Sequence, residues 1–196
     1  MKQFRTEKRK NKIISVLKAR QNSLSVVLEN IHDPHNVSAI FRTCDAVGVP
    51  KISLVYDLDQ FPKIGKKSSA SALKWVEKEK YKSIKECYDS LRENGFKIYA
   101  SALSESAKNL YELDLTEKVS IVLGNEHRGV SEQAAELADE IFLIPMYGMV
   151  QSLNVSVAAA VILYEAMRQR YEKGMYNKSD KNDKELESLI EKWSKR

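Results

Sequence analysis

Short apolar runs alternate with segments of helical periodicity along this chain, and that alternation constrains its fold more than any other feature. The apolar runs predict strands at residues 23–30, 51–56, 96–103, 119–126 and 140–145. Apolar residues at helical spacing, or a closing glycine, predict helices at 36–47, 83–94, 131–137 and 153–172. Continuously apolar strands that alternate with helices are typical of a mainly parallel sheet covered on both faces. We therefore expect an α/β fold.

The two ends of the chain carry further helical patterns, at about 4–19 and 183–196. Of the 32 basic and 27 acidic residues, residues 1–20 hold eight basic and one acidic, so the rest is close to neutral. A basic arm on a near-neutral body favours a polyanion partner, although a solvated helix that aids solubility is the alternative. We expect a basic arm at 1–20, a central domain at 21–172, and a polar linker with a helix at 173–196.

Several classes of protein are disfavoured by the composition. The apolar run at 155–164 is about half the ~20 residues that cross a bilayer, so we expect no membrane association. No signal peptide is visible in the first 20 residues. Cys44 and Cys87 have no partner motif and no histidine cluster beside them. They indicate reduced cysteines in a cytoplasmic protein, without a zinc or other metal site.

Three polar clusters follow predicted strands, where open α/β sheets bind their ligands. They are "NIHDPHN" at 30–36, "GNEHRG" at 124–129 and "PMYGMVQSLN" at 145–154. Each residue alone has a structural explanation: Asn36 as a helix cap, Glu126 as a solvated acid, and Arg42 paired with Asp45 on the helix surface. The chain has no P-loop, no GxGxxG fingerprint and no GxSxG elbow.

Together, the three clusters resemble the three motifs of the SPOUT-class RNA 2′-O-ribose methyltransferases. The matching segments are Asn36 with Arg42, Thr43, Ala46 and Gly48, then "GNEHRGVS", then "IPMYGMVQSLNVSVAAAVILYEA". The basic arm, "SSASALKWV" at 68–76 and "RQRYEKGMY" at 168–176 extend the similarity to nearly the whole chain. Lys12 departs from the arginine usual in the family, and "KKSSAS" at 66–71 lacks the glycines expected in that loop.

The resemblance implies a fold, a cofactor and a substrate. It implies a C-terminal trefoil knot at about 119–172, S-adenosylmethionine bound in the knot, and a homodimer whose site borrows residues from both chains. The short basic arm and the C-terminal helix favour members of the class that methylate the ribose of guanosine 18 in the tRNA D-loop. The alternatives are 2′-O-methylation of another tRNA or ribosomal RNA nucleotide, and a non-catalytic RNA-binding scaffold.

The resemblance also implies roles for individual residues. Arg42 is the expected catalytic group at the 2′-hydroxyl, either as a base assisted by an RNA phosphate or as a cation that stabilises the alkoxide. The residues expected to complete the site are Asn36, Glu126, Ser152 and Asn154. Those expected around the cofactor are Ala102, Leu103, Leu123, Gly124, Ile144, Met146, Ser152 and Leu153. Those expected to bind tRNA phosphates are Arg9, Lys12, Arg20, Arg168 and Arg170.

Overall fold

One parallel sheet organises the protein, which is described here from a computed structural model covering residues 6–63 and 72–195. Within these residues seven strands lie in the order β3-β2-β1-β6-β4-β7-β5, and each neighbouring pair is parallel. The strands are β1 Leu24–Glu29, β2 Lys51–Val55, β3 Glu77–Tyr81, β4 Lys97–Ser101, β5 Lys108–Asn109, β6 Val119–Leu123 and β7 Glu140–Leu143. The predicted α/β class is confirmed.

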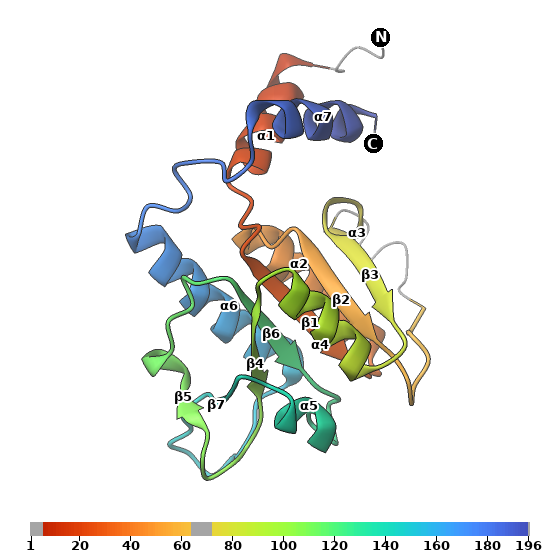
Figure 1. Cartoon of the computed structure of the whole chain (residues 1–196), viewed down its shortest axis with the longest axis vertical. Coiled ribbons are helices and arrows are strands. Elements are labelled where there is room, and N and C mark those ends of the chain that lie inside the picture. Colours follow the sequence, from red (N-terminus) through yellow and green to blue (C-terminus); the bar gives the residue numbers. More distant parts are fainter. Residues whose placement is uncertain (1–5, 64–71, 196) are drawn as a thin grey trace.

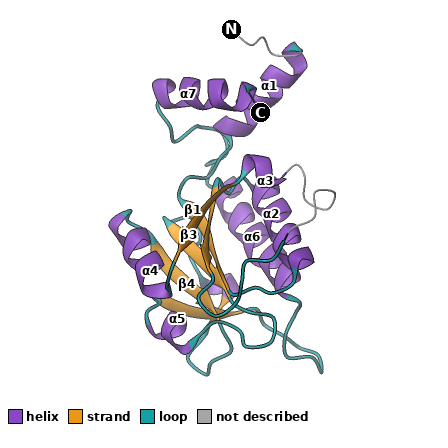
Figure 2. Ribbon diagram, turned by 90° about the vertical axis from the view of Figure 1, so that its right-hand side faces the viewer, coloured by secondary structure: helices purple, strands orange, loops and turns teal. Residues whose placement is uncertain are grey.

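Helices cover both faces of the sheet, with α2, α3 and α6 on one side and α4 and α5 on the other (Figure 2). The long α2 and α6 pack directly on each other. The described helices are α1 Glu7–Lys18, α2 Pro34–Val47, α3 Ala72–Trp75, α4 Ile84–Glu93, the 3-10 turn η1 Leu110–Glu112, α5 Glu132–Glu136, α6 Val155–Glu172 and α7 Asp183–Ser194.

The central strands β1 and β6 are buried along their whole length, which explains why both read as continuous apolar runs. Successive side chains still alternate between the two faces. Val26 and Leu28 belong to the core beneath α2 and α6. Val27 and Val122 belong to the core beneath α4 and α5. The sheet is therefore a rigid base for the loops that follow its strands.

The apolar pattern did not predict two strands and a short helix. The strand β3 reads Glu-Lys-Glu-Lys-Tyr, and its first four residues are exposed because it lies at the edge of the sheet. Lys51 on β2 pairs with Glu79 on β3 at 2.6 Å. Charged residues are common on edge strands, where they discourage pairing with other chains. The two-residue β5 and the four-residue α3 are too short to leave a periodic signal.

The two terminal helices pack against each other and form a small unit beyond the end of the sheet (Figure 1). Its buried residues are Ile13 and Leu17 of α1 with Leu186 and Trp193 of α7. Both predicted terminal helices are confirmed within the described range, although residues 4, 5 and 196 lie outside it. The basic arm is thus one half of a two-helix unit.

The described residues test the remaining predictions only in part. β4 lies between β6 and β7 in the sheet, but the threading of the trefoil knot stays a prediction. The segment "KKSSAS" and the start of "SSASALKWV" lie outside the described residues. Across residues 6–63 and 72–195, no helix has the length and hydrophobicity of a membrane span. The same residues contain no group of three or more metal-ligating side chains. Cys44 and Cys87 are buried free thiols.

Candidate active site

Three segments far apart in the sequence meet at the carboxyl end of the strands. Asn36 lies in the first turn of α2, Glu126 follows β6, and Asn154 caps the start of α6. Nδ2 of Asn154 donates to Oδ1 of Asn36 at 3.0 Å, and Nδ2 of Asn36 donates to Oε1 of Glu126 at 3.0 Å. The structure therefore joins one polar side chain from each of the three motifs into a continuous hydrogen-bonded chain.

Glu126 accepts more than the bond from Asn36. The backbone N–H of His32 donates to its Oε2 and that of Asp33 to its Oε1, each at 3.0 Å. Burial alone raises the pKa of Glu126, but the hydrogen bonds from Asn36, His32 and Asp33, together with its own backbone N–H, outweigh burial and hold that pKa below its usual value. An ionised carboxylate occupied by three donors is a weak base. Glu126 instead fastens the loop before α2 to the loop after β6.

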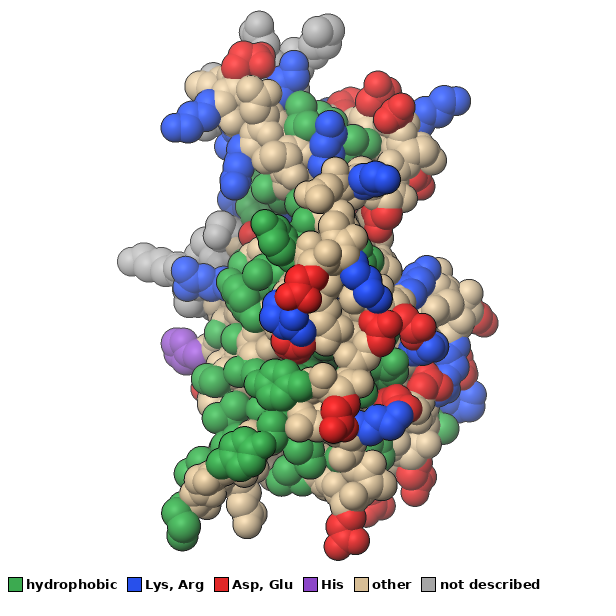
Figure 3. All heavy atoms as spheres, turned by 90° about the vertical axis from the view of Figure 1, so that its left-hand side faces the viewer, with side chains coloured by type: hydrophobic (Ala, Val, Ile, Leu, Met, Phe, Trp, Pro, Cys, Tyr) green, Lys and Arg blue, Asp and Glu red, His purple; other side chains and the backbone are tan. Residues whose placement is uncertain are grey.

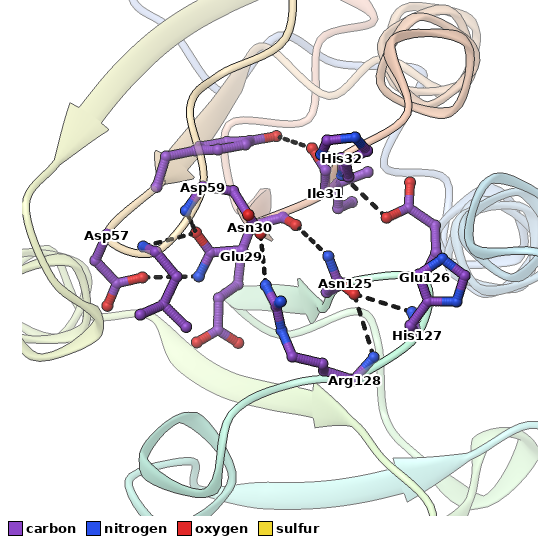
Figure 4. Close-up of polar contacts among 12 residues, drawn as sticks. Glu29, Asn30, Ile31, His32, Asp57, Asp59, Asn125, Glu126, His127 and Arg128 are labelled. Carbon is purple, nitrogen blue, oxygen red and sulfur yellow. Dashed lines mark hydrogen bonds and ion pairs between the residues drawn. The ribbon is translucent and has the colours of Figure 1, made fainter.

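A second polar layer supports this arrangement (Figure 4). Asn30 adopts a left-handed backbone conformation with φ of 50°, and its side chain donates to Asp57 at 2.7 Å. Its carbonyl accepts a bond of 2.7 Å from the side chain of Asn125. Oδ1 of Asn125 in turn accepts the backbone N–H groups of His127 and Arg128. The loop that presents Glu126 is therefore fixed by its own neighbours.

The backbone of this loop also demands a glycine at its start. A Cβ on Gly124 would lie 2.1 Å from the carbonyl carbon of Gly129 and from the nitrogen of Val130. That distance excludes any side chain, because the loop folds back on itself through two bonds of 2.9 Å between Asn125 and Gly129. Gly124 is thus required by close backbone packing.

A cavity of about 620 Å³ opens beside the hydrogen-bonded chain, between the loops that follow β4, β6 and β7. Its volume lies within the ~300–1,000 Å³ usual for small-molecule sites. Its lining combines small or apolar residues with polar and charged ones, among them Asn125, Glu126, His127, Arg128, Gln151, Ser152 and Asn154. All eight residues expected around the cofactor line it: Ala102, Leu103, Leu123, Gly124, Ile144, Met146, Ser152 and Leu153.

The polar residues at the head of α6 have separate positions. Ser152 is exposed and lines the cavity. Asn154 is the helix cap, because its Oδ1 accepts the N–H of Ser156 at 2.9 Å and the hydroxyl of Ser156 at 2.6 Å. Since its Nδ2 is bound to Asn36, Asn154 both begins α6 and ties that helix to α2.

Arg42 lies on α2, two turns beyond the start of the helix, and is exposed. Within residues 6–63 and 72–195 its side chain has no hydrogen bond or ion pair. The surface pair with Asp45, the structural alternative from the sequence, does not form, because Asp45 is bound to Arg20 at 2.6 Å. Arg42 is also not among the described residues that line the 620 Å³ cavity. The structure therefore leaves its guanidinium available to an outside partner.

Three of the five residues expected to bind phosphate lie at the surface. Lys12 is exposed and Arg9 is half-buried on α1. Arg168 on α6 keeps 55% of its side chain exposed while it pairs with Glu165 and Glu172, each at 2.8 Å. All three are accessible to RNA.

Arg20 and Arg170 lie inside the protein, and the structure corrects the expectation that they hold phosphates. Arg170 has no exposed surface, and burial lowers its pKa to about 10. Arg20 is 4% exposed and binds Asp45 and the carbonyls of Val49 and Trp75. The five bonds that the Arg170 guanidinium donates go to Leu115, Gln21, Ser23 (twice) and Glu117. Every partner is a group of this chain, and Nε of Arg20, which has no partner, is buried, so neither guanidinium faces a phosphate at the surface.

The sequence similarities of the chain agree with this geometry. Residues 23–164 match the model of the SpoU rRNA Methylase family. The chain belongs to the SpoU methylase family. This SpoU family chain is 46% identical, over 96% of its length and 97% of the relative, to the tRNA (guanosine(18)-2′-O)-methyltransferase of Thermus thermophilus.

Solved structures of SpoU proteins share the fold. The A. aeolicus TrmH/SpoU tRNA modifying enzyme superposes with a TM-score of 0.90 at 42% identity, over 96% of each chain. The SpoU methyltransferase AviRb from Streptomyces viridochromogenes, in complex with the cofactor AdoMet, has a TM-score of 0.69 at 25% identity. That alignment covers 79% of this chain and 62% of AviRb.

Sequence reasoning did not single out the residues that support the site of this SpoU family chain. Asn30 and Asn125 stood within the quoted motifs, but neither was expected to hold a loop. A non-glycine residue with positive φ, such as Asn30, leaves one signal: asparagine is the residue that tolerates it best. The hydroxyl of Ser156 donates to Asn154, a bond that the sequence pattern does not indicate.

Proposed function

We propose that this protein transfers a methyl group from S-adenosylmethionine to the ribose 2′-hydroxyl of guanosine 18 in the D-loop of tRNA. One observation carries the proposal: Asn36, Glu126 and Asn154 form one hydrogen-bonded chain at a cavity of ligand size. The activity in the name of the Thermus thermophilus relative supports this substrate, because the two chains match over almost their whole lengths.

The 620 Å³ cavity fits S-adenosylmethionine in both size and chemistry. Polar side chains at Gln151 and Ser152 suit the polar groups of the cofactor, and apolar residues such as Ile144 and Leu153 suit a ring. The cofactor supplies an electrophilic methyl group, so the proposed reaction involves no metal. The residues that line the cavity bind the cofactor and orient its methyl group toward the ribose hydroxyl. Such positioning lowers the barrier to transfer, because the two reacting groups already lie in the right geometry.

Arg42 is the residue we place at the 2′-hydroxyl. Its side chain is exposed and has no bonding partner within the described residues, so it is free to contact a substrate. It acts there in one of two ways. A nearby RNA phosphate helps it to accept the hydroxyl proton, or it stays charged and stabilises the alkoxide as it develops. Glu126 fits neither role because its oxygens are already occupied.

We propose a homodimer with residues of both chains at each site. Val157, Tyr164 and Tyr171 follow each other at seven-residue spacing on α6, and 48%, 50% and 72% of each is exposed. This spacing places them on one face of the helix. Apolar side chains gather on the side of the molecule drawn in Figure 3. Such a face suits a second copy of the chain, and a second copy would also bring an Arg42 to a cavity that its own chain leaves without one.

Basic residues at the surface and the two terminal segments form the proposed tRNA-binding part of the protein. Arg9, Lys12 and Arg168 are the groups we expect at tRNA phosphates, in a salt-sensitive interaction with little sequence preference. The arm at 1–20 and the segment at 173–196 serve the methyltransferase domain at 21–172 as a substrate-binding unit. We also propose that residues 119–172 form the knot and that the protein works in the cytoplasm beside its substrate.

The test is incubation with radiolabelled S-adenosylmethionine and an unmodified tRNA transcript, followed by nuclease mapping of the label. Label on the ribose of guanosine 18 supports the proposal. Label on another nucleotide, or on ribosomal RNA alone, replaces the substrate and keeps the chemistry. Absence of label, where a known methyltransferase works on the same transcript, favours a non-catalytic RNA-binding scaffold.

A further inference from the structure

A second cavity, of about 450 Å³, lies where the α1–α7 unit meets the body of the protein. No residue that lines it also lines the 620 Å³ cavity. We call it the arm cavity. Its described lining residues are Thr6, Lys8, Arg9, Lys12, Ile13, Val16, Asp45, Trp75 and Trp193.

Both tryptophans of the chain are at the arm cavity. Their ring centroids lie 4.8 Å apart, with the planes tilted by 43°. Trp193 is almost fully buried in the contact between α1 and α7, whereas Trp75 is half-buried and keeps part of its surface open. Aromatic faces beside apolar side chains such as Ile13 and Val16 form a platform on which a flat ring can stack.

The rim of the arm cavity is positively charged. Lys8, Arg9 and Lys12 lie along α1 at helical spacing and contribute three cations. The acid in the lining, Asp45, is bound to the buried Arg20 at 2.6 Å, so its charge is compensated within the protein. Tryptophan faces with several cations around them match the two halves of a nucleotide, a flat base and an anionic phosphate.

The arm cavity lies close to the proposed catalytic arginine. Asp45 follows Arg42 by three residues on α2, and residues three apart are neighbours on the surface of a helix. The cavity therefore opens about one helical turn from Arg42. A nucleotide next to one whose ribose lies at Arg42 would therefore be close to the arm cavity.

We propose that the arm cavity receives an unstacked base of the tRNA loop, a neighbour of the methylated nucleotide, stacked on Trp75 with its phosphate between Lys8, Arg9 and Lys12. This inference rests on the proposed function and deepens it. Single-stranded loops are recognised by bases turned out onto aromatic side chains, whereas bases within a duplex stay stacked and out of reach. The arm cavity thus gives the enzyme a reason to prefer a loop to a helix.

Intrinsic fluorescence tests this directly, because all tryptophan emission of the protein comes from the arm cavity. The protein is titrated with a tRNA transcript, with a short single-stranded RNA and with a duplex RNA of equal length, and filter binding records occupancy separately. We expect the transcript and the single strand to quench emission and the duplex to bind without quenching. Bound transcript with unchanged emission, or equal quenching by the duplex, would overturn the inference.

Two variants assign the effect to one ring. Trp193→Phe leaves Trp75 as the emitter, and quenching should persist. Trp75→Leu removes the stacking face but keeps apolar bulk, and we expect tRNA binding to weaken by roughly 5- to 150-fold. Trp75→Phe restores a face and should recover most of that affinity. Equal affinity of the Leu and Phe variants would contradict stacking, and S-adenosylmethionine binding should be unchanged in both.

The rim is tested with a matched pair on α1. Lys12→Gln removes a cation of the arm cavity, and Lys18→Gln removes an exposed one on the same helix outside its lining. Lys12→Gln should reduce both the affinity for tRNA and the quenching of emission. Lys18→Gln should change each of them much less.

The labelling experiment above separates the two proposals. Methylated guanosine 18 without quenching rejects the arm cavity alone, whereas quenching by the single strand without any methylation rejects the enzyme alone.

Discussion

Asn154 and Asn36 are 118 residues apart in the chain, and their side chains share a hydrogen bond of 3.0 Å. The bond links the N-cap residue of α6 to the first turn of α2, the helix that carries Arg42. The site is therefore held together from the ends of two packed helices.

Replacement of Asn36 by aspartate keeps the shape of the side chain but replaces its amide donor by a charged acceptor. Asn36→Asp would place a second carboxylate 3.0 Å from Glu126, where the amide now donates. We expect the unfolding free energy to fall by about 1–3 kcal/mol and the methylation rate to fall with it, because a buried donor is lost and like charges meet. Chemical denaturation and single-turnover kinetics measure the two effects. An aspartate variant as stable and active as the parent would show that the amide is dispensable.

The stability of the protein should depend on pH through Glu126. Its pKa is lower in the folded state than the ordinary 4.5, so its contribution is fully present above that value and is lost as the pH falls through the folded pKa. Glu126→Gln removes this contribution. The difference in unfolding free energy between parent and variant should be largest at neutral pH and should shrink in acid. A difference that stays constant, or that grows toward acid, would contradict the assignment.

Arg42→Lys should lose most of the transfer rate, on the order of 10²- to 10⁴-fold, because lysine cannot reproduce the planar fork of donors. Binding of S-adenosylmethionine should stay close to that of the parent, since Arg42 is not among the described residues of the 620 Å³ cavity. Single-turnover transfer and calorimetric titration provide the two readouts. Arg92→Lys on α4 is the control, and near-normal turnover of the Arg42 variant would remove Arg42 from the mechanism.

Arg168 and Arg170 occupy neighbouring positions on α6 and should respond in opposite ways. Arg170→Met leaves three backbone carbonyls and two side chains without their donor, and we expect it to cost about 3–5 kcal/mol of stability. Arg168→Gln removes two ion pairs, one to the buried Glu165 and one to the exposed Glu172, and should cost less stability than the Arg170 variant. It should also reduce the salt dependence of tRNA binding. Thermal unfolding and binding at several salt concentrations test both. A stable Arg170 variant with weakened tRNA binding would restore the phosphate role.

Tyr164→Glu should break the homodimer. Tyr164 is half exposed on α6 between Val157 and Tyr171, so a charge there would be buried against a second copy of the same face. We expect a monomer in sedimentation velocity and a loss of methylation, with the fold retained in circular dichroism. Leu58→Asp, at a residue that is 72% exposed outside α6, should stay dimeric. A parent protein that sediments as a monomer would reject the dimer itself.

The sequence predicted the elements whose signal lies in their own residues. The buried strands β1 and β6, the capped helix α2 and the long α6 were all expected, because burial imposes a pattern on each. The charged edge strand β3 was not, because its partners fix it and its side chains do not.

The same distinction holds in the site. The eight residues expected around the cofactor all line the 620 Å³ cavity, whereas the hydrogen bonds between Asn154, Asn36 and Glu126 depend on how distant segments pack. Arg20 and Arg170 differ in another way, since the sequence predicted them to contact RNA and the structure buries both. An arginine has the same letter whether it binds RNA or spans a core, and only burial separates the two.

The central claim is that the protein methylates one hydroxyl on one nucleotide, and removal of that oxygen is the most direct test. A tRNA ligated from two pieces, with 2′-deoxyguanosine at position 18 and ribose everywhere else, is compared with its all-ribose counterpart under single-turnover conditions. We predict equal binding of the two and methyl transfer to the ribose form alone. Transfer of comparable extent to the deoxy form would place the methyl group elsewhere and contradict the account.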